Sequence, residues 1–151
     1  MTRAHRSAGF SFIEILIVML IMGILTSMAY LRFGPQFQRS RVRAAANIIA
    51  TDLQTAQVLA ARERKPIVFS IDAAARTYTI TTRAADTVYV LRSMADGSDY
   101  EVDTLRTTAT SIQFFPNGIT SGAATVSVAS DAYSRSVTLS RAGQIRVASG
   151  S

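Results

Sequence analysis

The sequence predicts an α+β protein in which one long N-terminal helix precedes a head of antiparallel strands, arranged in two small sheets. Three observations predict this arrangement. Residues 10–30 are apolar with a single charge, a helical repeat of apolar residues continues to 64, and short β-branched and aromatic segments fill the rest. Because helix and strands are segregated along the chain, we expect the second half of the helix to cover one face of the sheets.

Residues 10–35 begin with the run FSFIEILIVMLIMGILTSMAY, which is long enough to cross the hydrocarbon of a bilayer as a helix. A helix can do this because it satisfies its own backbone hydrogen bonds. Glu14 is the exception, since a carboxylate placed centrally in such a span costs about 2.5–3.5 kcal/mol on insertion scales. No other residue of the run is charged, so Glu14 needs a cationic partner.

Residues 36–65 have the pattern of an amphipathic helix. Apolar residues recur at steps of three and four and form one stripe, made of Val42, Ala45, Ile49, Leu53, Ala56 and Ala60. Lys65-Pro66 is the expected end, since the residue before a proline avoids helical geometry. Arg39, Arg41 and Arg43 form a basic cluster, for which a solvated helix face and contact with anionic lipid or a neighbouring subunit are both open.

Residues 66–151 alternate between short strand segments and turn signals. The expected strands are 67–71, 77–81, 88–91, 101–106, 111–115, 124–130, 136–140 and 144–148. The pairs Asp96-Gly97, Asn117-Gly118 and Ala142-Gly143 mark tight turns between them. Runs at this spacing predict antiparallel hairpins.

The composition provides few of the side chains that catalytic sites commonly use. The chain has no cysteine, and its one histidine, His5, precedes the apolar run. The remaining residues therefore cannot form a Ser-His-Asp or Cys-His arrangement, and they lack the usual zinc ligands. We predict no enzyme activity, no cofactor and no small-molecule substrate. The acidic residues Asp96, Asp99, Glu101 and Asp103 miss the EF-hand spacing, so a solvated turn is expected and a calcium site is the alternative.

The segment Gly9-Phe10-Ser11-Phe12-Ile13-Glu14, preceded by Arg3 and Arg6, resembles the processing site of type IV prepilins and type II secretion pseudopilins. The resemblance implies that residues 1–9 are a leader, that prepilin peptidase cuts between Gly9 and Phe10, and that Phe10 is then N-methylated. The new α-ammonium has a reference pKa near ~8, and Glu14 follows four residues later on the same helix face. In the family this glutamate neutralises the ammonium of a neighbouring subunit as the helices stack into a fibre.

Two other interpretations of this segment are a cleaved secretory signal and a plain membrane anchor. Ser27-Met28-Ala29 resembles a signal cleavage site, but a signal core typically has about 7–15 residues and an acid within it would be unusual. A plain anchor leaves Glu14 unexplained. More arginines follow the apolar run than precede it, and the positive-inside rule would therefore place the C-terminal side in the cytoplasm. The resemblance implies the reverse: a single pass through the bacterial inner membrane with the head outside, then a periplasmic pseudopilus or cell-surface pilus.

Three residues of the long helix are candidates for loosening during fibre assembly. Gly23 lies where family members also have glycine, which implies that the helix can loosen there. The other explanation for a glycine at this position is that it lets neighbouring membrane helices approach closely. Pro35 removes one backbone donor and is expected to kink or interrupt the helix near Leu31. Gly34-Pro35 would therefore place the flexible point slightly later than in many pilins.

The tail from Ser111 resembles the GspH/FimT group of minor pilins and pseudopilins. The features that match are Phe114-Phe115-Pro116-Asn117-Gly118 and Gly143-Gln144-Ile145-Arg146-Val147. The resemblance implies a minor subunit whose partners are other pilin or pseudopilin subunits, bound through the N-terminal helix, together with prepilin peptidase and the inner membrane before assembly. A major fibre subunit is an alternative.

DNA binding in uptake is the other, less favoured alternative. Some FimT-like pilins bind DNA through a C-terminal Gly-Arg-x-Arg, and here Gln144 replaces the first arginine. Arg135 and Arg141 lie nearby in sequence, so they and Arg146 are the candidate phosphate contacts. The net charge of +6 is explained by solubility as easily as by an anionic partner.

Overall fold

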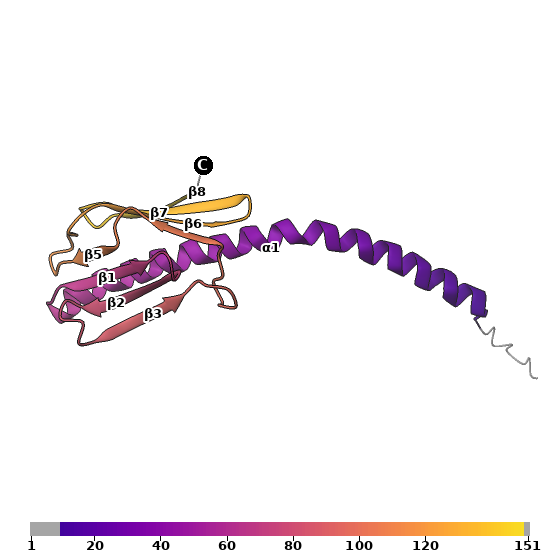
Figure 1. Cartoon of the computed structure of the whole chain (residues 1–151), viewed down its shortest axis with the longest axis horizontal. Helices are drawn as coiled ribbons and strands as arrows, with labels where there is room; N and C mark the ends of the chain where they lie inside the picture. Colours follow the sequence, from indigo (N-terminus) through magenta and orange to yellow (C-terminus); the bar gives the residue numbers. More distant parts are fainter. Residues whose placement is uncertain (1–9, 150–151) are drawn as a thin grey trace, which may run out of the picture. The chain divides into compact units, whose positions relative to one another are not determined.

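The computed structural model describes residues 10–149, apart from the side chains of residues 29–35. One helix and eight strands follow one another in this part of the chain (Figure 1). The chain divides into two compact units, Met1–Gln36 and Phe37–Ser151. The second unit, called the head below, therefore includes the outer half of the helix.

The helix α1 spans Phe12–Glu63 and ends where the sequence predicts. Arg64 adopts a φ of 54°, the left-handed conformation that commonly terminates helices, and Pro66 prevents continuation. The interruption expected near Leu31 is wrong, because the helix continues through Gly34 and Pro35, whereas a kink there stays a prediction. A proline removes only one backbone donor, and the hydrogen bonds of neighbouring turns maintain the helix. Loosening at Gly23, Gly34 or Pro35 during assembly stays a prediction.

The strands follow the predicted order, with shifts at their ends. They are β1 (Ile67–Asp72), β2 (Thr77–Thr82), β3 (Val88–Ser93), β4 (Thr104–Thr107), β5 (Ser111–Phe114), β6 (Ala124–Ser130), β7 (Tyr133–Leu139) and β8 (Ile145–Ser149). β4 begins three residues later than predicted, because Asp103 instead accepts hydrogen bonds from the Ser130 hydroxyl and the Asp131 amide. β7 begins three residues earlier, because its polar start pairs fully with β6.

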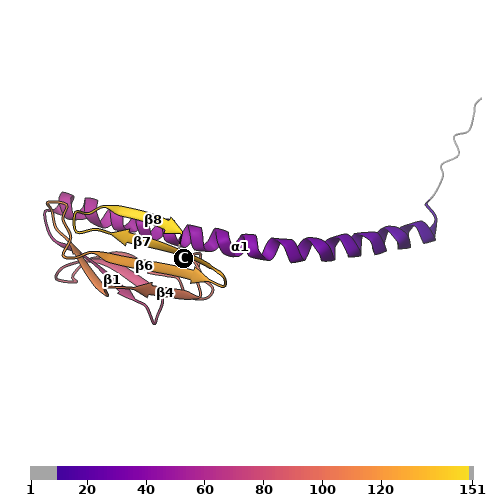
Figure 2. The same cartoon turned by 90° about the horizontal axis from the view of Figure 1, so that it is seen from above.

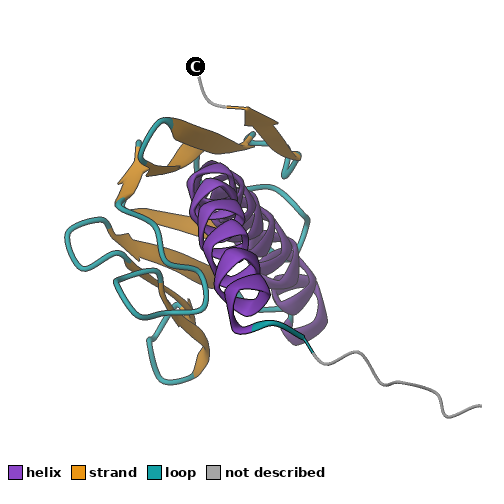
Figure 3. Ribbon diagram, turned by 90° about the vertical axis from the view of Figure 1, so that its right-hand side faces the viewer, coloured by secondary structure: helices purple, strands orange, loops and turns teal. Residues whose placement is uncertain are grey.

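Two four-stranded antiparallel sheets form the head, as predicted. Their strand orders are β3-β2-β1-β5 and β4-β6-β7-β8. Figure 3 shows the strands of the two sheets on two sides of the helix, and Figure 2 shows β8 running beside it. Along β6 every second residue is buried, which is the alternation expected of a strand with one face on the core.

The core lies between the helix stripe and the two sheets. Every residue of the predicted stripe, from Val42 to Ala60, is buried in one cluster with Phe69 of β1 and Phe114 of β5. The Phe69 and Tyr78 rings lie 5.1 Å apart in a tilted arrangement. Burial of these large side chains contributes about 1.5–3 kcal/mol each, so this stripe holds the outer half of the helix on the two sheets.

A buried carboxylate connects the helix to the first sheet. The Tyr78 hydroxyl donates to Asp52 Oδ2 at 2.6 Å, and the Arg92 guanidinium donates to both oxygens of the same carboxylate. Asp52 is 4% exposed. Burial and the Asp52 carboxylate raise the pKa of Tyr78, and the hydrogen bond to Asp52 raises the pKa of Arg92. Tyr78 therefore stays a neutral donor and Arg92 a cation.

The turn between β7 and β8 closely approaches the helix. Gly143 has a φ of 76°, and a Cβ there would lie 2.4 Å from the Gly118 carbonyl oxygen and 2.5 Å from Gln57 Nε2. Gln57 Nε2 donates to that same carbonyl at 3.2 Å. Only glycine fits this position, both for its backbone conformation and for its space.

We expect Gly143→Ala to lower the free energy of unfolding by about 1–3 kcal/mol, because the new methyl group must displace Gln57 or the Gly118 turn. Thermal unfolding of the full chain in an uncharged detergent measures this change. Gly122→Ala is the matched control, since its Cβ meets nothing within 4 Å and its φ is not positive. Equal midpoints for the two variants would contradict the prediction.

Candidate functional site

The N-terminal part of α1 exposes apolar side chains along its whole described length. Phe12 is 80% exposed, Leu20 65% and Met28 67%, and the large apolar residues between them are exposed as well. The Thr26 hydroxyl donates to the Met22 carbonyl oxygen at 2.7 Å, so it is satisfied within the helix. The segment thus presents an apolar surface that nothing in its own unit covers.

Glu14 lies in the first turn of α1 and is exposed. Its backbone amide donates to the Ser11 carbonyl oxygen at 3.0 Å. Phe10 precedes the helix and is 78% exposed, and a Cβ on Gly23 would meet nothing within 4 Å. Gly9, on the other side of the expected cleavage site, lies outside the described residues. The processing and pairing roles of Gly9, Phe10 and Glu14 stay predictions.

Within residues 10–149, no helix combines the length and the apolar character needed to cross a bilayer. The membrane crossing expected for residues 10–35 is therefore not confirmed by the structure.

The structure does not bring the three candidate DNA contacts to one surface. Arg135 pairs with the buried Val128 across β7 and β6, so its side chain lies on the helix-facing side of the sheet. Arg146 pairs with Thr138 and lies on the opposite side. Arg141 lies in the turn after β7, where its carbonyl accepts from the Thr120 amide. DNA binding stays a prediction, and gel-shift titration of the full chain across salt concentrations tests it.

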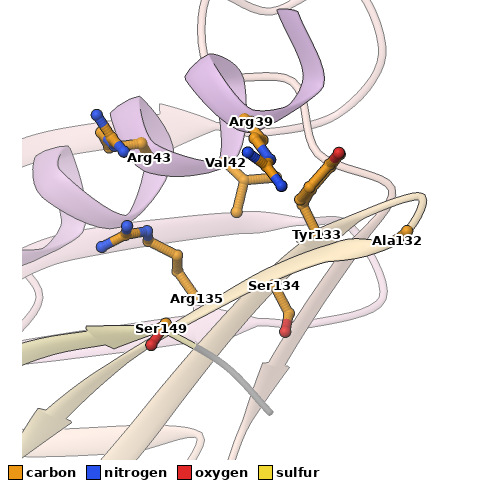
Figure 4. Close-up of a pocket in the computed structure, with 8 residues that line it drawn as sticks. All are labelled: Arg39, Val42, Arg43, Ala132, Tyr133, Ser134, Arg135 and Ser149. Carbon is orange, nitrogen blue, oxygen red and sulfur yellow. The ribbon is translucent and has the colours of Figure 1, made fainter. Parts of the chain in front are cut away.

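The structure splits the basic cluster that the sequence places at residues 39–43. Arg41 lies 3.6 Å from a carboxylate oxygen of Glu101. Arg39 and Arg43 are one turn apart and line a pocket of about 360 Å³ together with Arg135 of β7 (Figure 4). The four-residue spacing of Arg39 and Arg43 indicates a shared helix face. Their meeting with Arg135 depends on the fold, and sequence analysis missed it.

The acidic residues considered for calcium do not converge. Asp96 pairs with Arg76 at 2.8 Å, Glu101 with Arg41, and Asp103 with the Ser130 hydroxyl and the Asp131 amide. Across the described part of the chain, no group of three potential metal ligands comes together. The calcium alternative therefore has no shared set of oxygens here.

Comparisons with known proteins agree with the fold and with the N-terminal motif. Residues 45–143 match the family model described as type II transport protein GspH, and residues 4–30 match the prokaryotic N-terminal methylation motif. No curated protein sequence matches the chain.

Two solved structures with this fold are a type IV minor pilin and a minor pseudopilin. The type IV minor pilin FimU of Pseudomonas aeruginosa has a TM-score of 0.61 and 19% identity, covering 73% of this chain and 90% of its own. The minor pseudopilin EpsH of the Vibrio cholerae type 2 secretion system has a TM-score of 0.56 and 16% identity. The match covers 72% of this chain and 97% of EpsH. At these identities the likeness shows the fold. Because the family model covers most of the chain, this protein belongs to the family described as type II transport protein GspH.

Proposed function

We propose that the chain is a minor subunit of a type IV pilus or of a type II secretion pseudopilus. The observation that carries this proposal is the exposed apolar surface of α1 between Phe12 and Met28, in which Glu14 is the only charge. A helix that is apolar on all sides needs a bilayer or the helices of other subunits around it. The match of residues 4–30 to the methylation motif supports the same role.

The family and the motif also support anchoring in the bacterial inner membrane before assembly, with the head outside the cytoplasm. In this proposal prepilin peptidase cuts between Gly9 and Phe10, and Phe10 is then N-methylated. Methylation leaves the amine charged, so it can still pair with Glu14 of another subunit. The partners of the mature chain are then the other subunits of the fibre, and it has no substrate to convert.

Minor rather than major status is supported by the GspH family and by the likeness in fold to FimU and EpsH. A minor subunit is present in far fewer copies than the main one. Quantitative mass spectrometry of sheared fibres or purified pseudopili measures the ratio. A ratio near one copy for each fibre layer would make this chain the major subunit instead.

The test of processing is mass analysis of the N-terminus of the native protein. We expect the mature chain to begin at an N-methylated Phe10. Gly9→Val should leave residues 1–9 attached, because a bulky branched residue blocks the cut. Ala8→Val places the same branched side chain one position earlier and serves as the control for processing. A native chain that begins at Met1 or Tyr30 with an unmodified amine would overturn the proposal.

A further inference from the structure

The pocket shown in Figure 4 is lined by three arginines, and none of the described residues that line it is acidic. Arg39 and Arg43 come from α1, Arg135 comes from β7, and Ser149 of β8 lines the same pocket. Ser149 is the residue paired with Arg135 across β7 and β8. Two distant segments of the chain thus contribute cations to one recess of the head.

Among the described residues, none of these three arginines has a carboxylate oxygen within 4.0 Å. The ion pairs of the head involve other arginines, namely Arg41, Arg62, Arg76 and Arg92. Like charges that share a recess repel one another, and an anion between them removes that repulsion. The pocket therefore has the charge of an anion-binding site, and the part of the chain from residue 10 to 149 places no carboxylate in it.

The pocket is also partly preorganised. The Arg39 guanidinium carbon lies 4.5 Å from the centroid of the Tyr133 ring, so the cation is stacked on an aromatic face. Val42, which is 1% exposed, supplies an apolar lining on the helix side. A guanidinium fixed by stacking loses less conformational freedom when it binds an anion.

We propose that this pocket binds a phosphomonoester group, carried by a lipid headgroup or by a small soluble molecule. A phosphomonoester carries a charge of about −1.5 to −2 and three acceptor oxygens, which suits three guanidinium forks better than a single carboxylate does. A volume of about 360 Å³ accommodates one such group.

A recess of this kind favours a single phosphate over a nucleic-acid strand. DNA needs cations repeated along a surface, each meeting one phosphate of the backbone. Arg141 and Arg146 do not continue the set, because Arg146 lies on the other side of the sheet and Arg141 in the turn beyond β7. The three pocket arginines instead line one recess of limited volume.

Isothermal titration of the full chain in an uncharged maltoside detergent tests the proposal. The probes are inorganic phosphate, dihexanoyl phosphatidic acid and, as a zwitterionic control, dihexanoyl phosphatidylcholine. We expect phosphate and phosphatidic acid to bind and phosphatidylcholine not to bind. Much tighter binding of phosphatidic acid identifies a lipid headgroup as the natural source, and similar binding of both identifies a soluble phosphate compound.

Variants separate the pocket from the general positive charge of the chain. Each single Arg→Gln change in the pocket should weaken binding roughly tenfold, equivalent to about 1.4 kcal/mol. The triple variant Arg39→Gln/Arg43→Gln/Arg135→Gln should abolish it. Lys65→Gln/Arg83→Gln/Arg106→Gln removes the same charge from exposed positions outside the pocket and should retain binding. Thermal unfolding without ligand verifies that both triple variants are folded.

Three outcomes overturn the proposal. The first is no binding of phosphate or phosphatidic acid by the native chain. The second is an equal loss of binding in the two triple variants, which would mean diffuse charge attraction. The third is binding of duplex DNA that requires the pocket arginines while neither small phosphate binds, which would make this a nucleic-acid surface.

Discussion

Glu14→Gln should yield a chain that is made and processed normally but reaches the fibre at least tenfold less often, a ratio that corresponds to about 1.4 kcal/mol per subunit. In the proposed fibre the Glu14 carboxylate meets the methylated ammonium of Phe10 on a neighbouring chain, among apolar side chains that exclude water. Glutamine keeps the shape and the helix but leaves that ammonium uncompensated. An unpaired charge in such surroundings costs several kcal/mol.

The measurement is the share of the chain in the sheared-fibre or pseudopilus fraction, relative to the membrane fraction, by quantitative immunoblot. Glu63→Gln makes the same chemical change on the same helix, where the carboxylate pairs with the exposed Arg62. This control should assemble normally. Mass analysis of the N-terminus verifies that both variants are cut after Gly9. Assembly of Glu14→Gln at the native level would rule out the pairing.

Asp52→Ala should lower the free energy of unfolding by about 2–4 kcal/mol. The substitution removes the carboxylate that accepts from both Tyr78 and Arg92. Arg92 is partly exposed and can turn toward water, which lowers the cost, but the Tyr78 side chain is 1% exposed and its hydroxyl loses its partner. Thermal unfolding of the full chain in uncharged detergent, followed by circular dichroism, reports the change.

Tyr78→Phe provides the comparison, because it removes the hydroxyl and leaves the Asp52–Arg92 pair intact. Its expected cost is about 1 kcal/mol, the net value of one hydrogen bond. The double variant should cost less than the sum of the two single changes, since it leaves no orphaned hydroxyl. Strict additivity, or an unfolding midpoint of Asp52→Ala equal to that of the native chain, would show that the buried carboxylate does not connect helix and sheet.

Local patterns of apolar and polar residues predicted most of the head, because apolar residues recur at the positions that face the core. The stripe from Val42 to Ala60 predicted the buried face of α1, and the run at residues 124–130 predicted β6 to the residue. The pattern failed where side chains are polar. The start of β7 is Tyr133-Ser-Arg-Ser, which has no apolar alternation, yet its backbone pairs fully with β6. Pairing with a neighbouring strand therefore extended β7 beyond what its own residues indicate.

By itself the sequence determined the order of helix and strands, the apolar N-terminal segment with its single acid, and the turns at Asn117-Gly118 and Ala142-Gly143. Tertiary structure alone decided which charged residues meet. It separated Arg135 from Arg146 by placing them on opposite sides of one sheet, joined Arg135 to Arg39 and Arg43, and buried Asp52 against Tyr78. The physical reason is the sequence separation over which each effect acts. Periodicity and turn chemistry involve a few neighbouring residues, whereas these contacts depend on strand register and on helix packing across the whole head.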